Sequence, residues 1–289
     1  MTSPPDLPPN VHISSHPCLL AKLSQLRSKE TAAKDVKSLV HDISLLIGCD
    51  ALAASTTPVQ GAKVRVPPPS NRPPDADAPR KRQHLICLHP YLQGETDLGF
   101  TYDTMTIAPQ TISLIPILRS GLAMVDALQT ILPDPVPIHH LGLYREPSTL
   151  EPVEYYNNLP HHIPDPIVKA NSPSAATLAP SSTIAPTVEA EVDGTGAPHA
   201  SSLAIILDPV IATGGTCAAA IQTLREWGAR RIVVLSIVGA AEGVRRAAEE
   251  WPEATDIWLA AVDPELTGRG MIKPGLGDIG DRLFLTIGK

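Results

Sequence analysis

The chain has 289 residues, enough for one large α/β domain or two smaller ones, and 43% of them are hydrophobic although only 3% are aromatic. The formal net charge of −7 argues against a nucleic-acid partner, because a protein that binds a phosphate backbone carries a basic face. The longest apolar runs are strand-sized, so we expect no membrane span and no membrane partner.

The four cysteines lie far apart and form no CxxC pair, so the sequence predicts neither a zinc site nor a disulfide framework. At the start of the chain, "MTSPPDLPPN" is polar and rich in proline where a signal peptide would have an apolar region. We therefore expect a soluble, cytoplasmic protein with reduced thiols.

Three segments have the composition of unstructured chain. Residues 1–10 are rich in proline, residues 56–84 contain "PPP" and "RPP", and residues 161–200 consist largely of Pro, Ala, Ser and Thr. Such stretches bury too little apolar surface to offset the loss of chain entropy. We expect a disordered N-terminus and two low-complexity insertions in a single domain that covers residues 11–289.

Between these segments, apolar strand patterns alternate with amphipathic helix patterns. The predicted elements, in chain order, are a helix over 33–47, a strand over 111–118, a helix over 121–131, strands over 136–144 and 203–207, a helix ending near Gly228, a strand over 231–240, a helix over 241–251 and a strand over 256–262. Apolar strands separated by helices are typical of a parallel sheet covered on both faces. The predicted fold class is α/β, with an open, mostly parallel sheet.

The stretch "LAIILDPVIATGGTCAAAI" (203–221) follows one of these strands into a loop and a helix. Ligands of open parallel sheets bind beyond the carboxyl ends of the strands. Gly214 and Gly215 let backbone N–H groups converge on an anion, Thr213 and Thr216 add hydroxyl donors, and the helix N-terminus is positive. Asp208 suits the hydroxyls of a sugar, because a carboxylate accepts hydrogen bonds from a cis-diol. The loop therefore predicts a site for a sugar phosphate.

The segment "LDPVIATGGT" (207–216) closely resembles the phosphoribosyl-diphosphate signature of type I phosphoribosyltransferases, and its Asp-Pro form resembles the uracil phosphoribosyltransferase branch. Other segments are similar to motifs of that family in the same order: "HPCLLAKLSQLR" (16–27), "PILRSGLAMVDAL" (116–128), "LGLYREPSTLEPVEYYNNLP" (141–160) and "GMIKPGLGDIGDRLF" (270–284). The resemblance implies the type I phosphoribosyltransferase fold, with a small hood formed by the N- and C-terminal segments. It also implies an enzyme of pyrimidine salvage that makes UMP and diphosphate from uracil and 5-phospho-α-D-ribose 1-diphosphate.

The resemblance assigns roles to individual residues. It implies that phosphoribosyl diphosphate is bound by Arg119, Arg145, Asp208, Pro209, Val210, Ile211, Ala212, Thr213, Gly214, Gly215, Thr216 and Asp278, and that uracil is bound by Ile272, Gly277, Asp278 and Ile279. The implied catalytic residues are Arg119, Arg145 and Asp278. Both arginines follow a predicted strand, so their guanidiniums could hold a diphosphate through bidentate hydrogen bonds. We expect Mg²⁺ to be carried mainly by the diphosphate, and a homo-oligomer, either a dimer or a tetramer.

Other functions fit the sequence less well. A catalytically degenerate family member that serves as a nucleotide-binding or interaction module would not need to keep the loop, both arginines and Asp278. An RNA-binding regulator is disfavoured by the acidic charge, and a purine phosphoribosyltransferase by the "IKPGLGDIGD" ending. The G-x-G-x-x-G within "PGLGDIGD" follows a proline and precedes too short a tail for a dinucleotide-binding unit. One departure is Leu285, which stands where the family usually has Gly.

The histidine pairs 139–140 and 161–162 have no acid or cysteine ligand pattern nearby. They are predicted to be structural, and no protein metal site is expected.

Overall fold

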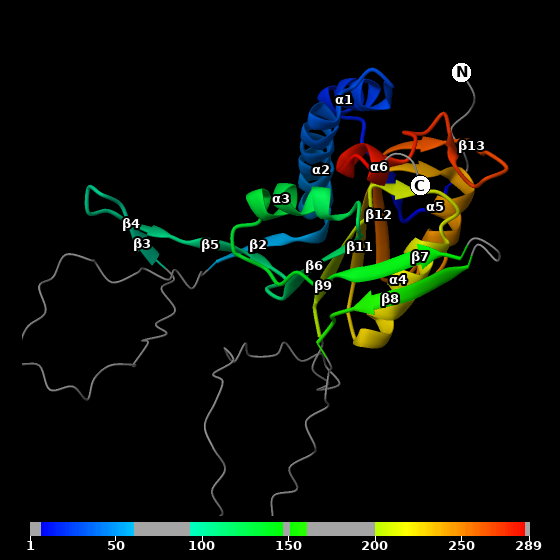
Figure 1. Cartoon of the computed structure of the whole chain (residues 1–289). Coiled ribbons are helices and arrows are strands. Elements are labelled where there is room, and N and C mark those ends of the chain that lie inside the picture. The colour runs from blue at the N-terminus through cyan, green and yellow to red at the C-terminus, as the bar shows by residue number, and fades with distance from the viewer. Residues whose placement is uncertain (1–6, 61–92, 147–150, 161–199, 287–289) are drawn as a thin grey trace, which may run out of the picture. The chain divides into compact units, whose positions relative to one another are not determined.

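The computed structural model describes residues 7–60, 93–146, 151–160 and 200–286 (Figure 1). The chain divides into two compact units, one formed by residues 1–55 with 110–289 and the other by residues 56–109. Most of the predicted low-complexity segments, namely residues 1–6, 61–84 and 161–199, lie outside the described residues. Residues 7–10 are described, and Asn10 is buried there with its side-chain amide bonded to the carbonyls of Ala248 and Thr255.

The first unit is built on one sheet whose central strands are all parallel. The strand order is β1 (Val11–Ile13), β12 (Thr255–Asp263), β11 (Ile232–Ala240), β9 (Leu203–Leu207), β6 (Ile112–Leu118), β7 (Leu141–Arg145) and β8 (Pro152–Asn157), and β10 (Val210–Ile211) pairs with β11. Only the β7–β8 pair in this sheet is antiparallel. The predicted open, mostly parallel sheet is confirmed.

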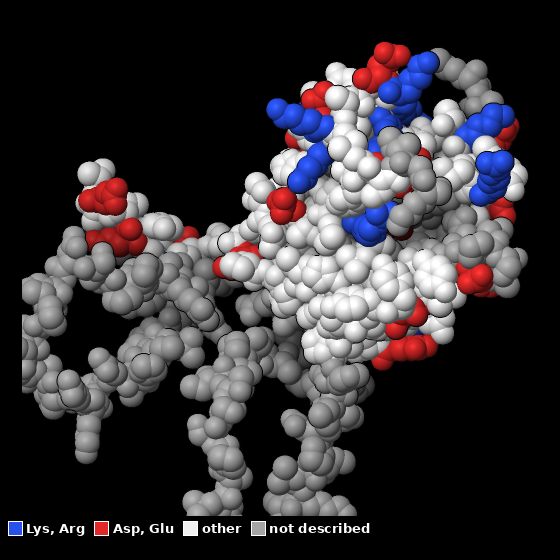
Figure 2. All heavy atoms as spheres, in the orientation of Figure 1, with Lys and Arg blue, Asp and Glu red and all other residues white. Residues whose placement is uncertain are grey.

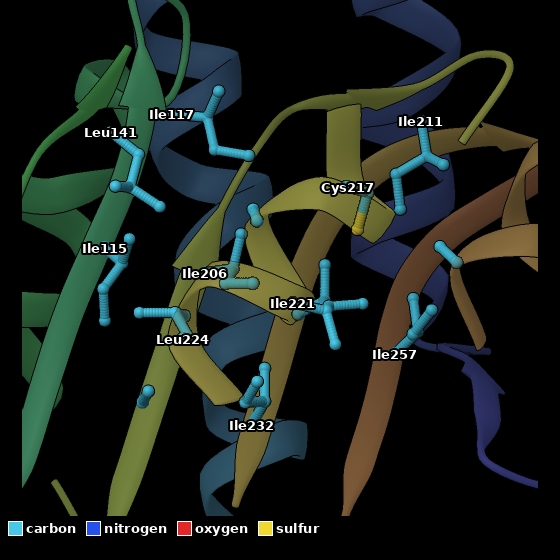
Figure 3. Close-up of a cluster of buried hydrophobic side chains, with 14 of the residues drawn as sticks. Ile115, Ile117, Leu141, Ile206, Ile211, Cys217, Ile221, Leu224, Ile232 and Ile257 are labelled. Carbon is cyan, nitrogen blue, oxygen red and sulfur yellow. The ribbon is translucent and has the colours of Figure 1, made fainter. Parts of the chain in front are cut away.

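Helices cover both faces of the sheet. Helices α1 (Pro17–Arg27), α2 (Ala33–Ser55) and α3 (Leu122–Ile131) pack together, with α2 on β11 and α3 on β6. Helices α4 (Gly215–Trp227) and α5 (Ala241–Ala248) pack on each other, and α5 also lies on β11 and β12. Figure 3 shows Ile221 and Leu224 of α4 in front of the strands that carry Ile206 and Ile232, with a blue helix behind the same strands. Because both faces are covered, β9 and β11 are buried along their whole length and read as continuous apolar runs.

Helix α2 is the one described helix that is long and apolar enough to cross a membrane by length and composition, with a mean hydropathy of 1.3 over its most apolar window. Its apolar residues are interrupted by polar ones, so it contains no long uninterrupted apolar run in the sequence. Its buried stripe, which includes Val40, Ile43 and Ile47, packs against α3 and β11. This is the role of a core helix in an α/β domain.

Three predicted elements differ from the observed ones by several residues. Helix α2 continues to Ser55 instead of ending at residue 47. Strand β7 begins at Leu141 instead of residue 136, and the preceding segment pairs with β6 only through an isolated bridge between Leu114 and Ile138. Pro135 and Pro137 lie in that segment, and a proline has no N–H for a ladder. Helix α5 ends at Ala248 instead of Trp251, shortly before Pro252, which disfavours helical backbone in the residue that precedes it.

The C-terminal segment adds a small antiparallel pair, β13 (Glu265–Leu266) with β14 (Ile272–Lys273), and the short helix α6 (Ile279–Phe284). Helix α6 packs on α2. Arg27 of α1 donates a hydrogen bond to the carbonyl of Gly275, and Arg282 of α6 donates one to the carbonyl of Leu26 in α1. The N- and C-terminal segments therefore come together as the predicted hood.

The second unit contains two antiparallel pairs. Strand β2 (Thr57–Gln60) pairs with β5 (Met105–Ala108), and β3 (Gln93–Glu95) pairs with β4 (Thr101–Asp103). Four of its described apolar or aromatic side chains, Leu98, Phe100, Tyr102 and Met105, are more than half exposed.

Charged side chains of both signs are mixed on the described surface. Figure 2 shows Lys and Arg beside Asp and Glu around the end of the first unit that carries α1 and α6. Below this end, toward β9, a broad area carries few charged side chains. In this view, the described residues of the first unit form no extended face of a single sign.

The helix α6 ends in a residue with left-handed backbone, Leu285, at φ 53° and ψ 37°. A residue with a Cβ atom pays about 1–2 kcal/mol for this conformation, whereas Gly adopts it freely. Leu285 is 71% exposed, so its side chain contributes little packing that a substitution would remove. Glycine, which the family resemblance predicts at this position, would adopt this backbone without strain.

We expect Leu285→Gly to raise the free energy of unfolding by about 0.5–1 kcal/mol, because the relief of strain exceeds the extra chain entropy of glycine in the unfolded state. Chemical denaturation of the two proteins measures this difference. Leu285→Ala removes the same side chain but keeps the strain, and it should give no such gain. Equal stability of the Gly and Ala variants would show that the backbone at this position is not strained.

Candidate active site

A cleft of about 300 Å³ lies at the carboxyl edge of the parallel strands. Arg119 follows β6 and Asp208 follows β9, and these strands are neighbours in the sheet. Their ends approach closely because Gly121 has no side chain, since a Cβ atom there would lie 2.2 Å from the carbonyl oxygen of Leu207. Residues 277–280 of the C-terminal segment line the same cleft. The structure therefore brings together one residue predicted for the diphosphate (Arg119), one for the ribose (Asp208) and three for the base (Gly277–Ile279).

The Arg119 side chain is 56% exposed and reaches toward α6. Its Nη2 atom lies 3.9 Å from Oδ1 of Asp281, and its guanidinium carbon lies 5.9 Å from the ring centroid of Phe284. A long, exposed ion pair of this kind holds its partners weakly. The guanidinium is therefore available to an anion that enters the cleft.

Arg145 is the last residue of β7, which pairs in parallel with β6 through Leu118 and Gly142. Its backbone thus lies at the carboxyl end of the strand next to β6, as predicted. The side chain of Arg145 lies outside the described residues.

The loop between β10 and α4 has backbone that only glycine fits. Gly214 has φ 78°, and a Cβ atom on it would lie 2.2 Å from the carbonyl oxygen of Gly243. A Cβ atom on Gly243 would lie 2.0 Å from the carbonyl oxygen of Ala212. Helix α5 therefore supports the loop from behind by direct backbone contact. The N-terminus of α4, which starts at Gly215, carries the positive end of its dipole at this loop.

Asp208 lines the cleft but is only 8% exposed. Its Oδ1 atom accepts one long hydrogen bond, of 3.5 Å, from the N–H of Val210, and the described side chains offer it no ion pair. Burial raises the pKa of Asp208 to about 7, and the N–H of Val210 offsets this rise in part. A buried carboxyl without a cation is suited to neutral hydroxyl donors, which the ribose of a nucleotide precursor provides.

The raised pKa makes stability depend on pH. Unfolded chains lose the Asp208 proton near pH 3.8, whereas the folded chain keeps it until about pH 7, so the free energy of unfolding falls as pH rises across this window. Asp208→Asn removes the effect. We expect this variant to be more stable than the parent at pH 8, on the order of 3–4 kcal/mol at most, with the advantage shrinking toward pH 4. Denaturant titrations at pH 4, 6 and 8 measure it, and a stability difference that is constant with pH would contradict the assignment.

The predicted base-binding residues take different places. Gly277, with φ 72°, and Asp278 and Ile279 line the cleft. Asp278 is the N-cap of α6, and its Oδ1 atom accepts a hydrogen bond of 3.0 Å from the N–H of Asp281. Ile272 does not line the cleft, since it belongs to β14, where it pairs with Leu266; its neighbour Met271 lines the cleft instead.

Two residues predicted to bind phosphoribosyl diphosphate have their side chains in the protein interior. Ile211 is 1% exposed and belongs to the core cluster drawn in Figure 3, and Pro209 is buried while its carbonyl accepts from the N–H groups of Ile237 and Val238. Their contribution to the site is to fix the loop, because strand β10 joins the sheet at β11. Of the predicted loop residues, Asp208, Val210 and Ala212 line the cleft.

Several residues at this site were not predicted from the sequence. Ser120 and Gly280 line the cleft, Asp281 faces Arg119, and Gly243 supports the loop from α5. Ser120, Gly280 and Asp281 lie inside quoted motifs, so their neighbourhood was visible in the sequence. Gly243 lies in a helix pattern without any motif, and only the folded backbone reveals its role.

The comparisons with known proteins agree with this geometry. A family model described as uracil phosphoribosyltransferase matches residues 83–286. A uracil phosphoribosyltransferase of Roseiflexus castenholzii is 35% identical over 276 residues, which cover 96% of this chain and 98% of that protein, and one of Desulfitobacterium hafniense is 32% identical over the same shares. The solved structure of the AQ2163 protein from Aquifex aeolicus superposes with a TM-score of 0.65 at 22% identity, covering 96% of this chain and 98% of that one, which supports the fold.

The matched residues include the cleft, the loop before α4 and the part of the C-terminal segment that lines the cleft. The family-model match and the relatives above 30% identity along nearly the whole chain together establish the family of this protein. The chain belongs to the uracil phosphoribosyltransferase family, and it is an enzyme of the glycosyltransferase type.

Proposed function

We propose that this enzyme transfers the phosphoribosyl group of 5-phospho-α-D-ribose 1-diphosphate to N1 of uracil, which gives UMP and diphosphate and serves pyrimidine salvage. The observation that carries the proposal is the cleft at the carboxyl edge of β6 and β9, where Arg119, Asp208 and residues 277–280 meet. Each of these groups suits one part of the two substrates.

Different groups of the site suit different parts of the phosphoribosyl donor. The loop before α4 and the helix N-terminus suit the 5-phosphate, and Asp208 suits the ribose hydroxyls. Arg119, together with Arg145, suits the diphosphate, where charge accumulates when the bond from C1 to the diphosphate oxygen breaks. The electron pair of that bond leaves with the diphosphate, a new bond forms between C1 and N1 of uracil, and the N1 proton is released.

The base is recognised by the main chain of residues 277–279. Backbone N–H and C=O groups present a fixed pattern that fits the two carbonyls and one N–H of the uracil edge. One carboxylate oxygen of Asp278 caps α6 by accepting a hydrogen bond from the N–H of Asp281. We therefore assign Asp278 the role of holding this main chain beside the transferred ribose. Its second oxygen stays available to the base or the ribose.

We further propose that Mg²⁺ enters on the oxygens of the diphosphate. Among the described residues no group of three or more His, Cys, Asp or Glu side chains gathers, so the ion would keep waters and substrate oxygens as ligands. When bound, the ion neutralises charge on the leaving diphosphate. We also propose that the enzyme works in the cytoplasm as a homo-oligomer. The alternative of a catalytically degenerate binding module gains no support from the site, which keeps its charged residues.

The proposal is tested by incubating the protein with uracil, 5-phospho-α-D-ribose 1-diphosphate and Mg²⁺, and by following UMP by chromatography and diphosphate by a coupled assay. UMP and diphosphate should appear in equal amounts, and chelation of Mg²⁺ should stop both. Binding of the phosphoribosyl donor without any UMP would indicate the degenerate module instead.

A further inference from the structure

The main chain just before the base-recognition residues is held by three charged side chains. The N–H of Gly275 donates to Oδ2 of Asp263 at 2.9 Å, and the carbonyl of Gly275 accepts from Nη1 of Arg27 at 2.8 Å. The carbonyl of the next residue, Leu276, accepts from Nη1 of Arg282 at 2.8 Å. Three consecutive peptide units, from 274–275 to 276–277, are therefore fixed directly before the base-recognition residues.

The same side chains tie this loop to the end of helix α1. Arg27, the last residue of α1, forms a bidentate pair with Asp263, with both N–O distances at 2.8 Å. Arg282 donates to the carbonyls of Leu26 and Ser28 at 2.7 and 2.9 Å. The loop thus rests on a segment that lies more than 230 residues earlier in the chain.

These contacts differ in kind from ordinary surface ion pairs. The side chains of Arg27 and Asp263 are 23% and 7% exposed, and burial lowers the pKa of Arg282. Charge-assisted, bidentate bonds in such surroundings fix geometry tightly, and loss of one partner leaves the other charge buried alone. By contrast, Lys22 and Asp42 join α1 to α2 by an ion pair at 2.7 Å that is about one third exposed and bonds to no loop residue.

We propose that Arg27, Asp263 and Arg282 are positioning residues for base recognition. This inference rests on the proposed function, in which the main chain of residues 277–279 reads the base. None of the three side chains lines the cleft, so they act through the loop. They hold its donors and acceptors in register with the uracil edge, and they bond to no described residue of β6, β9 or α4, which carry most of the phosphoribosyl site.

The test compares Arg27→Ala, Arg27→Lys and Asp263→Asn with Lys22→Ala as the matched control on the same helix. Arg27→Ala should raise KM for uracil about 10- to 100-fold, the scale of a small misplacement of a binding group, and should lower the preference for uracil over cytosine. KM for the phosphoribosyl donor should stay within about twofold. Arg27→Lys keeps the charge but loses the bidentate guanidinium, so its KM for uracil should lie between those of Arg27→Ala and the parent. Lys22→Ala should leave both KM values unchanged.

Equal increases in both KM values, or the same changes in Lys22→Ala, would overturn the proposal, because either result means general destabilisation. Amide hydrogen exchange of residues 275–280 provides a second measurement that needs no catalysis. Exchange there should speed up in Arg27→Lys and Asp263→Asn and stay unchanged in Lys22→Ala; unchanged exchange in all three would show that the side chains do not hold the loop. If the parent protein makes no UMP, the proposed function fails. The exchange data still decide whether Arg27 and Asp263 hold the loop.

Discussion

Arg119→Ala is expected to lower kcat/KM for UMP formation by about 10²- to 10³-fold, the usual effect of removing a preorganised group that stabilises developing charge. Arg119 is placed at the end of β6 in the cleft, and the described contacts of its guanidinium are a 3.9 Å pair with Asp281 and the ring of Phe284. Because these contacts are weak and exposed, the variant should unfold at nearly the same temperature as the parent. Steady-state kinetics and thermal denaturation measure the two effects separately.

Arg231→Ala is the matched control for this experiment. Arg231 is a similarly exposed arginine paired with Asp256 at 3.2 Å, but it precedes β11 and so lies at the amino edge of the sheet. Its loss should leave kcat/KM unchanged. Arg145→Ala should behave like Arg119→Ala if both arginines hold the diphosphate. Full activity in Arg119→Ala would show that Arg119 does not stabilise the leaving diphosphate.

Gly214→Ala is expected to raise KM for the phosphoribosyl donor at least about 100-fold, because the loop must move and a displacement near 1 Å has that effect. The added Cβ atom would lie 2.2 Å from the carbonyl oxygen of Gly243, and it would stand on a backbone with φ 78°. Gly243 cannot yield as a flexible side chain would, because the atoms that the added Cβ atom would meet are all backbone atoms of Gly243. KM for uracil, measured at saturating donor, should change little, because the base lies against another segment.

Gly243→Ala should produce the same defect although it lies outside the phosphate loop, since its Cβ atom would lie 2.0 Å from the carbonyl oxygen of Ala212. Gly268→Ala is the control, because a Cβ atom on Gly268 meets nothing within 4 Å. If Gly243→Ala binds the donor normally while Gly214→Ala does not, the support that α5 gives to the loop is not needed for phosphate binding.

The elements that the sequence predicted well are those whose pattern follows from burial on both faces. Strands β6, β9 and β11 are continuous apolar runs, and α4 ends at Gly228, whose φ of 97° is the left-handed backbone expected of a glycine there. Strand β1 was not predicted. It contains three residues, and its place is set by pairing with β12, which lies more than 240 residues away.

In the candidate site, too, residues marked by a local pattern could be predicted and residues placed by distant contacts could not. Arg119, Asp208 and Gly277–Ile279 could be predicted because strand ends and family motifs mark them, and the cleft brings them together. The inward direction of Ile211 could not be predicted, because it depends on β10 joining the sheet after the loop has left β9. The bonds of Arg27 and Arg282 also escaped prediction, since each joins segments that no local pattern connects.

The most direct measurement of the central claim is kcat/KM for uracil and cytosine in the diphosphate-release assay, with orotate and hypoxanthine as competing bases. Cytosine replaces the O4 acceptor of uracil with an amino donor, so fixed backbone groups would be left unpaired at about 1–3 kcal/mol each. A site built on such hydrogen bonds should favour uracil by about 10⁴-fold. The account predicts that uracil is by far the best of the four bases. Comparable kcat/KM for cytosine and uracil, or a preference for hypoxanthine, would contradict it.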